Sequence, residues 1–154
     1  MKKFRYLFAV LFIVLDQLTK YIVRANLALG ESVDVIPKIC SFTYVRNYGA
    51  AFSSLVGQTF ILKYLPIALI IICIVILEVY IKSHWTFLTS LLLIASGGVG
   101  NLIDRWYFGY VTDMIDFHFF PVFNVADICV TCGCGFLILY VLFFDKTEKT
   151  DGKQ

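Results

Sequence analysis

Residues 111–127 read Val-Thr-Asp-Met-Ile-Asp-Phe-His-Phe-Phe-Pro-Val-Phe-Asn-Val-Ala-Asp. This stretch places Asp113, Asp116 and Asp127 in an aromatic, apolar setting directly before a long apolar run. A carboxylate at the edge of lipid is energetically costly and usually has a function. Two interpretations are open. Either the acids are solvated in a re-entrant or interfacial loop, or two of them share a proton and activate a water molecule.

The composition of the chain is that of a membrane protein. Of its 154 residues, 60% are hydrophobic and 17% are aromatic. The mean hydropathy is +0.83, and the apolar share lies well above that of an average soluble domain. The net charge of +2 is small and the basic residues are scattered, which argues against a nucleic-acid partner. We therefore expect one membrane domain covering residues 1–154.

Four apolar runs are long enough to form transmembrane helices. They cover about residues 4–23, 60–81, 85–103 and 127–144, and a helix needs about 20 apolar residues to cross the hydrocarbon layer. The segment at about 24–59 contains glycine, proline and mixed charges, and its residues 39–45 alternate partly like a strand. The sequence predicts an all-α polytopic membrane protein with four transmembrane helices and a small extramembrane β-rich cradle after the first helix.

The distribution of lysine and arginine predicts the orientation of these helices. Four spans place both tails on the same side of the membrane as the connection at Lys82. That side carries more basic residues than the opposite loops, which contain Arg24, Lys38, Arg46 and Arg105. The positive-inside rule then predicts cytoplasmic termini and places the acids of residues 111–127 towards the outer face.

Polar residues also occur at helical spacing inside the predicted spans. Asp16 and Lys20 are four apart on one face, with the acid first, which is the favourable order. An intrahelical ion pair and a direct contact with a substrate are both consistent with this spacing. Asn101, Asp104 and Arg105 share a face at the end of the third run. They either serve helix packing with an ion pair at the helix end, or project towards the acids of the next segment.

Two further stretches predict local backbone features. Asn124 is well placed to cap the fourth helix, which would put Asp127 in its first turn. The run Asn47-Tyr48-Gly49-Ala50-Ala51-Phe52 has small residues where the backbone can approach a ligand closely. Gly49 is expected to supply a turn there.

The five cysteines, at positions 40, 73, 129, 132 and 134, match neither a metal site nor a disulfide framework. Three of them form Cys-x-x-Cys-x-Cys inside the last apolar run, with no second cluster and no nearby histidine to complete four ligands. We expect these three side chains to be buried as small hydrophobic groups. No metal and no other cofactor is predicted.

The residues available for catalysis are mainly carboxylates. No serine or cysteine is expected near His118, so a nucleophile of the triad kind is unsupported. No His-Glu-x-x-His motif occurs, which argues against a metalloprotease.

If Asp113 and Asp127 converge, repulsion and burial oppose double ionisation, so one stays protonated near neutral pH. Aspartic proteases use such a pair. Their carboxylate takes a proton from water and their carboxylic acid donates to the substrate carbonyl oxygen. The helix dipole favours a charged Asp127, which predicts Asp127 as the base and Asp113 as the acid.

A protein of a different class remains an alternative. A small proton-coupled transporter or channel would use Asp16, Asp113 and Asp127 as a relay. Against it, these acids gather towards one face, and four spans without an inverted repeat make a poor transporter. A structural membrane adaptor would not need the acids.

Five motifs, in this order, resemble those of the bacterial lipoprotein signal peptidases, the signal peptidase II family. They are Asp16-Gln17-Leu18-Thr19-Lys20, Asn47-Tyr48-Gly49-Ala50-Ala51-Phe52, Gly97-Gly98-Val99-Gly100-Asn101-Leu102-Ile103-Asp104-Arg105, Val111-Thr112-Asp113 and Phe123-Asn124-Val125-Ala126-Asp127. The resemblance implies an aspartyl endopeptidase of the bacterial cytoplasmic (inner) membrane. Such an enzyme removes the signal peptide of prolipoproteins just before a diacylglyceryl-modified cysteine.

By position, the resemblance implies that Asp113 and Asp127 are the catalytic pair. It also implies contact with membrane lipid and inhibition by globomycin-type cyclic peptides. The family commonly has Val-Val-Asp-Phe where this chain has Val-Thr-Asp-Met, and commonly a serine where this chain has Ile128, differences that we expect to affect only the pocket shape. The implied substrate-binding residues are Asn47, Gly49, Asn101, Arg105, Asn124, Asp16 and Lys20.

Overall fold

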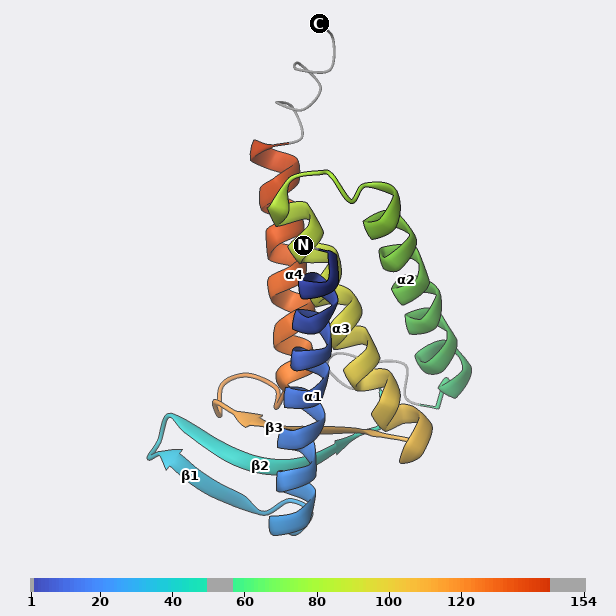
Figure 1. The fold of residues 1–154 in the computed structure, drawn as a ribbon. Helices are drawn as coiled ribbons and strands as arrows, with labels where there is room; N and C mark the ends of the chain where they lie inside the picture. Colours follow the sequence, from blue (N-terminus) through green and yellow to red (C-terminus); the bar gives the residue numbers. More distant parts are fainter. Residues whose placement is uncertain (1, 50–56, 145–154) are drawn as a thin grey trace, which may run out of the picture.

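The computed structural model describes residues 2–49 and 57–144. Ala50, Ala51 and Phe52, part of the run predicted to let the backbone approach a ligand, and the charged tail at 145–154 lie outside the described residues. The elements in chain order are α1 (Lys2–Asn26), β1 (Ser32–Ile36), β2 (Cys40–Asn47), α2 (Thr59–Val79), α3 (Trp85–Tyr107), β3 (Val111–Asp116) and α4 (Val125–Phe143). The sheet lies across one end of the four helices, and α1 begins and α4 ends at the other (Figure 1).

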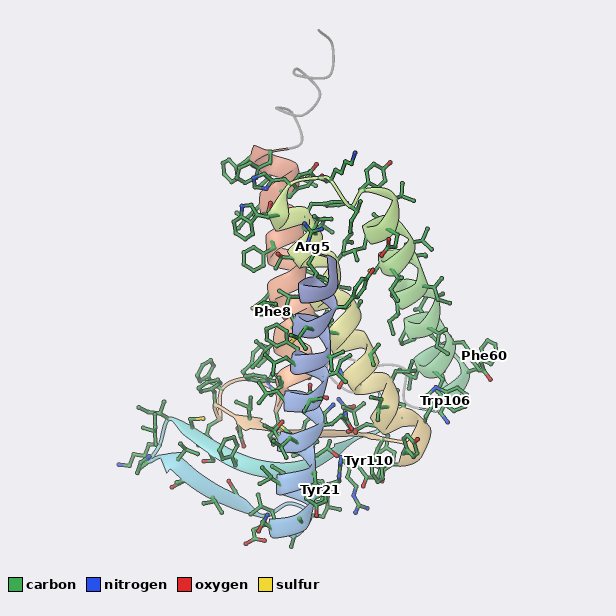
Figure 2. All side chains as sticks on the ribbon, viewed as in Figure 1. Arg5, Phe8, Tyr21, Phe60, Trp106 and Tyr110 are labelled. Carbon is green, nitrogen blue, oxygen red and sulfur yellow. The ribbon has the colours of Figure 1, made fainter. Side chains whose placement is uncertain are left out.

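The four helices have the length and apolar composition of membrane spans, which confirms a multi-pass membrane protein. The third span is longer than predicted, since α3 continues past residue 103 to Tyr107. Trp85 and Trp106, near its two ends, are both exposed. They are separated by about 30 Å of helix, the thickness of the hydrocarbon layer, and tryptophan is typical of membrane interfaces. Figure 2 shows Trp106 and Phe60 together near the sheet end.

Helix α3 is the centre of the bundle, because it packs against α1, α2 and α4. Three glycines allow this, each facing a different helix. A Cβ at Gly97 would collide with the carbonyl oxygen of Ala126 in α4, one at Gly98 would lie 3.0 Å from Ile70 in α2, and one at Gly100 would lie 2.6 Å from Asp16 in α1. Glycine is thus needed at the points of closest helix approach.

The cradle is a three-stranded antiparallel sheet in the order β1-β2-β3. A strand was predicted at residues 39–45 and is confirmed as β2. The third strand was not predicted, and the interpretation of residues 111–116 as part of a loop is wrong. This segment is rich in β-branched side chains, which suit a strand, and it pairs Val45 with Asp113 and Asn47 with Val111. The pairing brings residues more than 60 positions apart in sequence to one end of the bundle.

The thiol groups are only partly where the sequence analysis expected them. All five cysteines are free, but Cys132 and Cys134 are exposed, whereas Cys129 is buried. The expected burial of all three in the bundle is therefore wrong for two of them. A thiol on the outside of a membrane helix faces lipid, which accommodates a small hydrophobic group as the bundle interior does.

The packing of α3 on α4 generates a first prediction. Gly97→Ala adds a methyl group against the Ala126 backbone and the Val130 side chain, and such overpacking is destabilising. We expect its Tm in detergent to fall by roughly 3–10 °C. Gly135→Ala is the matched control, because nothing lies within 4 Å of a Cβ at that position. Equal Tm values for the two variants would contradict the close approach.

Candidate active site

A cavity of about 610 Å³ opens between α2, α3, α4 and the sheet. Its polar end carries Asp113 of β3 and Asp127 of α4. The rest of its wall is mainly apolar, from α2, α3, α4 and the connection between β3 and α4, and includes Leu65, Leu69, Ile70, Ile94, Val122 and Val130. The cavity therefore joins a polar end, where the acids lie, to an apolar groove along the helices.

Asp113 is 2% exposed and held by two side-chain amides. Asn124 Nδ2 donates to its Oδ1 at 2.6 Å, and Asn47 Nδ2 donates to its Oδ2 at 3.1 Å. Burial, together with the negative charge of Asp127, raises the pKa of Asp113 to about 6. The carboxyl group therefore keeps its proton to a higher pH than an ordinary aspartate does.

Asp127 lies in the first turn of α4, and the predicted cap of that helix is confirmed. Asn124 is the N-cap, and its Oδ1 accepts from Asp127 N at 2.9 Å while Asp127 Oδ2 accepts from Asn124 N at 3.2 Å. This reciprocal pair is a capping box. Asn101 Nδ2 of α3 donates to the remaining oxygen, Asp127 Oδ1, at 2.8 Å.

The two acids are therefore held by one residue, Asn124, which contacts both. Each of the four oxygens of Asp113 and Asp127 accepts one N–H, three from side-chain amides and one from the backbone. A carboxylate oxygen has a second lone pair, so this arrangement leaves room for a water molecule or a proton on the side of the cavity.

The other predicted site residues fall into two groups. Arg105 lines the cavity and its Nη2 donates to Gly49 O at 3.1 Å, while Gly49 N donates to Asn47 Oδ1 at 2.9 Å. These bonds tie the end of β2 to α3. Asp16 and Lys20 are 1% and 0% exposed and form the predicted intrahelical ion pair at 2.9 Å. Their predicted contact with a substrate remains a prediction.

The roles of Arg24 and Thr112 were not predicted from the sequence. Asp104 Oδ2 accepts from Thr112 N at 2.8 Å, and Asp104 Oδ1 lies 3.4 Å from Arg24 Nη1. Asp104 thus fixes the start of β3, one residue before Asp113, to both α1 and α3. The spacing Asp16, Lys20, Arg24 places a third charged residue on the same face of α1, a signal that was available in the sequence.

A serine does lie beside an imidazole, contrary to expectation. Ser41 Oγ is 3.1 Å from His118 Nε2, and His118 Nδ1 is 3.6 Å from Asp116. Ser41 is fully buried and its hydroxyl donates to Asp34 Oδ1 at 2.8 Å, so its proton is not directed at the imidazole. The cluster follows from the pairing of Ser41 with Asp116 across β2 and β3, and it does not have the arrangement of a nucleophile.

Asp16, Asp113 and Asp127, the acids that a transporter relay would use, do not form a ladder across the bundle. Asp104 and Asp113 are held at β3, and Asp16 Oδ1 accepts from Ala126 N at the start of α4, at 2.9 Å. These groups lie at the sheet end of the helices with Asp127. Among residues 2–49 and 57–144, no three His, Cys, Asp or Glu side chains are arranged to hold a metal ion.

Fold and site together define a multi-pass membrane protein with a pair of carboxyl groups in a cavity between its helices. A family model described as signal peptidase (SPase) II matches residues 8–143. The chain belongs to this family, as its motifs indicated.

Individual relatives agree with this assignment. The lipoprotein signal peptidase of Streptococcus agalactiae serotype Ia is 44% identical over 126 residues, which cover 80% of this chain and 82% of the relative. That of Haemophilus ducreyi is 42% identical over 147 residues, covering 90% of each. A bacterial membrane enzyme structure solved by the in meso method at 2.3 Å resolution has a TM-score of 0.85 and 31% identity, covering 99% of this chain and 92% of that one.

The environment of Asp113 generates a second prediction. The pKa of Asp113 is about 6 in the folded chain, which is higher than the pKa of an aspartate in the unfolded chain. The folded state therefore becomes less stable relative to the unfolded state as the pH rises from about 4 through 6. We expect the Tm of Asp113→Asn to rise relative to that of wild type over this pH range. The rise should correspond to a difference of at most about 3 kcal/mol in the free energy of unfolding. Thermal unfolding in detergent at intervals between pH 4 and 7 measures this difference. At pH 4 both folded proteins carry a neutral residue 113, which provides the reference. A difference independent of pH would contradict the raised pKa.

Proposed function

We propose that this protein is an aspartyl endopeptidase that removes the signal peptide from prolipoproteins, cutting just before the diacylglyceryl-modified cysteine. The observation that carries the proposal is the pair of carboxyl groups, Asp113 and Asp127, both held by Asn124 at the polar end of an otherwise mainly apolar cavity. Membership of the signal peptidase II family supports the same activity.

In the proposed reaction Asp127 is the base and Asp113 is the acid. The Asp127 carboxylate takes a proton from a water molecule, whose oxygen adds to the peptide carbonyl carbon, while Asp113 gives its proton to the carbonyl oxygen. The tetrahedral intermediate then collapses. Asp127 passes its proton to the leaving amine, and Asp113 recovers a proton from the hydroxyl of the new acid. The raised pKa of Asp113 suits the role of acid.

The shape of the cavity suits a substrate with both a peptide and a lipid part. Asn47, Asn101 and Arg105 stand beside the acids and supply donors for the peptide backbone. The apolar groove continues along α2, α3 and α4, where hydrocarbon from the diacylglyceryl group or the signal helix would be excluded from water. In this proposal membrane lipid surrounds the bundle, and globomycin-type cyclic peptides occupy the same cavity.

The other predicted substrate-binding residues, Gly49, Asn124, Asp16 and Lys20, lie next to the groups that line the cavity. Gly49 and Asn124 hold Arg105 and the two acids through hydrogen bonds. Asp16 and Lys20 lie behind the acids, between α1, α3 and α4.

A cleavage assay tests this function and is the third prediction. Purified protein in detergent should cut a diacylated precursor and leave an unmodified precursor uncut. Asp113→Asn and Asp127→Asn keep the side-chain shape but remove the carboxylate, so we expect each to lower kcat by at least about 1,000-fold. Asp116→Asn, which changes a carboxylate of the same strand outside the cavity, is the matched control and should retain activity. Near-normal turnover by either of the first two variants would refute the catalytic pair.

We also propose that the protein lies in the bacterial cytoplasmic membrane with both termini in the cytoplasm and the cavity towards the outer face. The sheet lies at the end of the bundle opposite the start of α1 and the end of α4 (Figure 1). Asp113 belongs to strand β3 of that sheet and Asp127 to the first turn of α4, and basic residues favour the side of the termini.

Fusion proteins provide a fourth prediction. A phosphatase that folds only outside the cytoplasm should be inactive when fused to Gln154 and active when fused after Gly109, between α3 and β3. The reverse pattern would show that the bundle is inserted in the opposite orientation.

A further inference from the structure

Lys20 is a fully buried lysine beneath the two acids, at 0% exposure. Its ammonium lies 2.9 Å from Asp16 Oδ2, 3.7 Å from Asp104 Oδ2 and 2.9 Å from Asn101 Oδ1. A buried charge is tolerated only when it is paired, and the two carboxylates meet that need. The neutral amide of Asn101 adds nothing to the charge balance, but its oxygen accepts one of the three N–H donors of the buried ammonium, and this contact in turn constrains the amide.

The contact fixes which way the Asn101 amide faces. An amide group can turn over and exchange its oxygen with its nitrogen, but an ammonium has only donors. Lys20 therefore requires the oxygen of Asn101, and the NH₂ group is left to donate to Asp127 Oδ1 at 2.8 Å. The reversed amide would set NH₂ against the ammonium and an oxygen against the carboxylate. Both contacts would be repulsive.

The amide of Asn124 is fixed in a similar way. The backbone N–H of Asp127 requires the Asn124 oxygen at 2.9 Å, so Asn124 Nδ2 points to Asp113 Oδ1, and also to Asn101 Oδ1 at 3.1 Å. The oxygen of Asn101 thus accepts from both Lys20 and Asn124. The NH₂ group of Asn101 thus donates to Asp127, and the NH₂ group of Asn124 donates to Asp113.

We propose that Lys20 is a positioning residue of the active site, which together with Asn124 holds the Asn101 amide in the direction that presents an N–H donor to the Asp127 carboxylate. This inference rests on the proposed function, since it concerns the acids of that reaction. Without Lys20 the Asn101 oxygen keeps only the donor from Asn124 Nδ2 at 3.1 Å, so the amide is held less firmly and the Asp127 carboxylate that it holds shifts relative to the attacking water. Displacement of a reacting group by about 1 Å slows the chemical step by about 100-fold, whereas the cavity walls that bind substrate stay in place.

A purely structural role for Lys20 makes a different prediction. Asp16, Lys20, Arg24 and Asp104 form a cluster of two acidic and two basic residues. Lys20→Met alone leaves an unpaired buried carboxylate, which destabilises the fold. Lys20→Met combined with Asp16→Asn keeps the cluster neutral and retains an oxygen for Ala126 N. If the lysine only balances charge, the double variant should recover both stability and turnover.

The test measures Tm, kcat and KM of the full-length protein in detergent with a diacylated precursor peptide, with kcat expressed per mole of folded protein after size exclusion. We expect the double variant to regain the Tm that Lys20→Met loses. Its kcat should stay about 100-fold below wild type, with KM within about threefold. Lys82→Met, in the exposed connection before α3, is the matched control and should change none of these values.

The outcomes distinguish the positioning role of Lys20 from the proposed function. Wild-type kcat in the double variant, or a loss confined to KM, overturns the positioning role while the proposed function stands. Wild-type protein that fails to cut the diacylated precursor overturns the proposed function and the positioning role with it.

Discussion

The buried ion cluster between α1 and α3 is the interaction on which the rest of the structure depends. Asp104 joins α3 to Lys20 and Arg24 of α1 and accepts the backbone N–H of Thr112 at the start of β3. Asp16 joins α1 to the first turn of α4. Because charges buried away from water must be paired, a helix that slid or rotated would leave one uncompensated. The cluster therefore sets the register of three helices and one strand, and the two acids follow from that register.

The closest helix contacts and the hydrogen bonds of the buried polar side chains lie at the same level of the bundle. Gly97 and Gly100 let α3 approach α4 and α1 closely, and Asn101 then reaches both Lys20 and Asp127. The same residues would be too far apart if α3 carried larger side chains there. A short glycine-rich stretch in the third helix thus determines the helix spacing that the candidate site requires.

Local patterns in the sequence predicted much of this arrangement. Contacts between residues far apart in the sequence could not be predicted from those patterns. Length and hydropathy gave the four spans, and residue spacing gave the Asn124 cap and the Asp16–Lys20 ion pair, because each depends on neighbours within one turn. Strand β3, the contact of Ser41 with His118 and the role of Asp104 depend on residues between 8 and 84 positions away. The outward direction of Cys132 and Cys134 depends on the rotation of α4, which its nearly uniform apolar sequence does not encode.

The walls of the cavity are held in place by two kinds of contact. The wall that α2 forms is held mainly by packing, whereas the acids are held by hydrogen bonds. Helix α2 packs on α3, and the hydrogen bond from Tyr6 to Glu78 fastens it to α1 at the end remote from the sheet. The candidate acids come from β3 and α4, and the amides that hold them come from β2, α3 and the cap of α4. At the sheet end α2 contacts α3 through side chains such as Tyr64 and Lys63 on Trp106. Moving α2 sideways would cost mainly apolar and aromatic contacts, whereas moving an acid would break charged hydrogen bonds. A bulky guest can therefore displace the α2 wall of the cavity while the hydrogen bonds that hold the candidate acids stay intact.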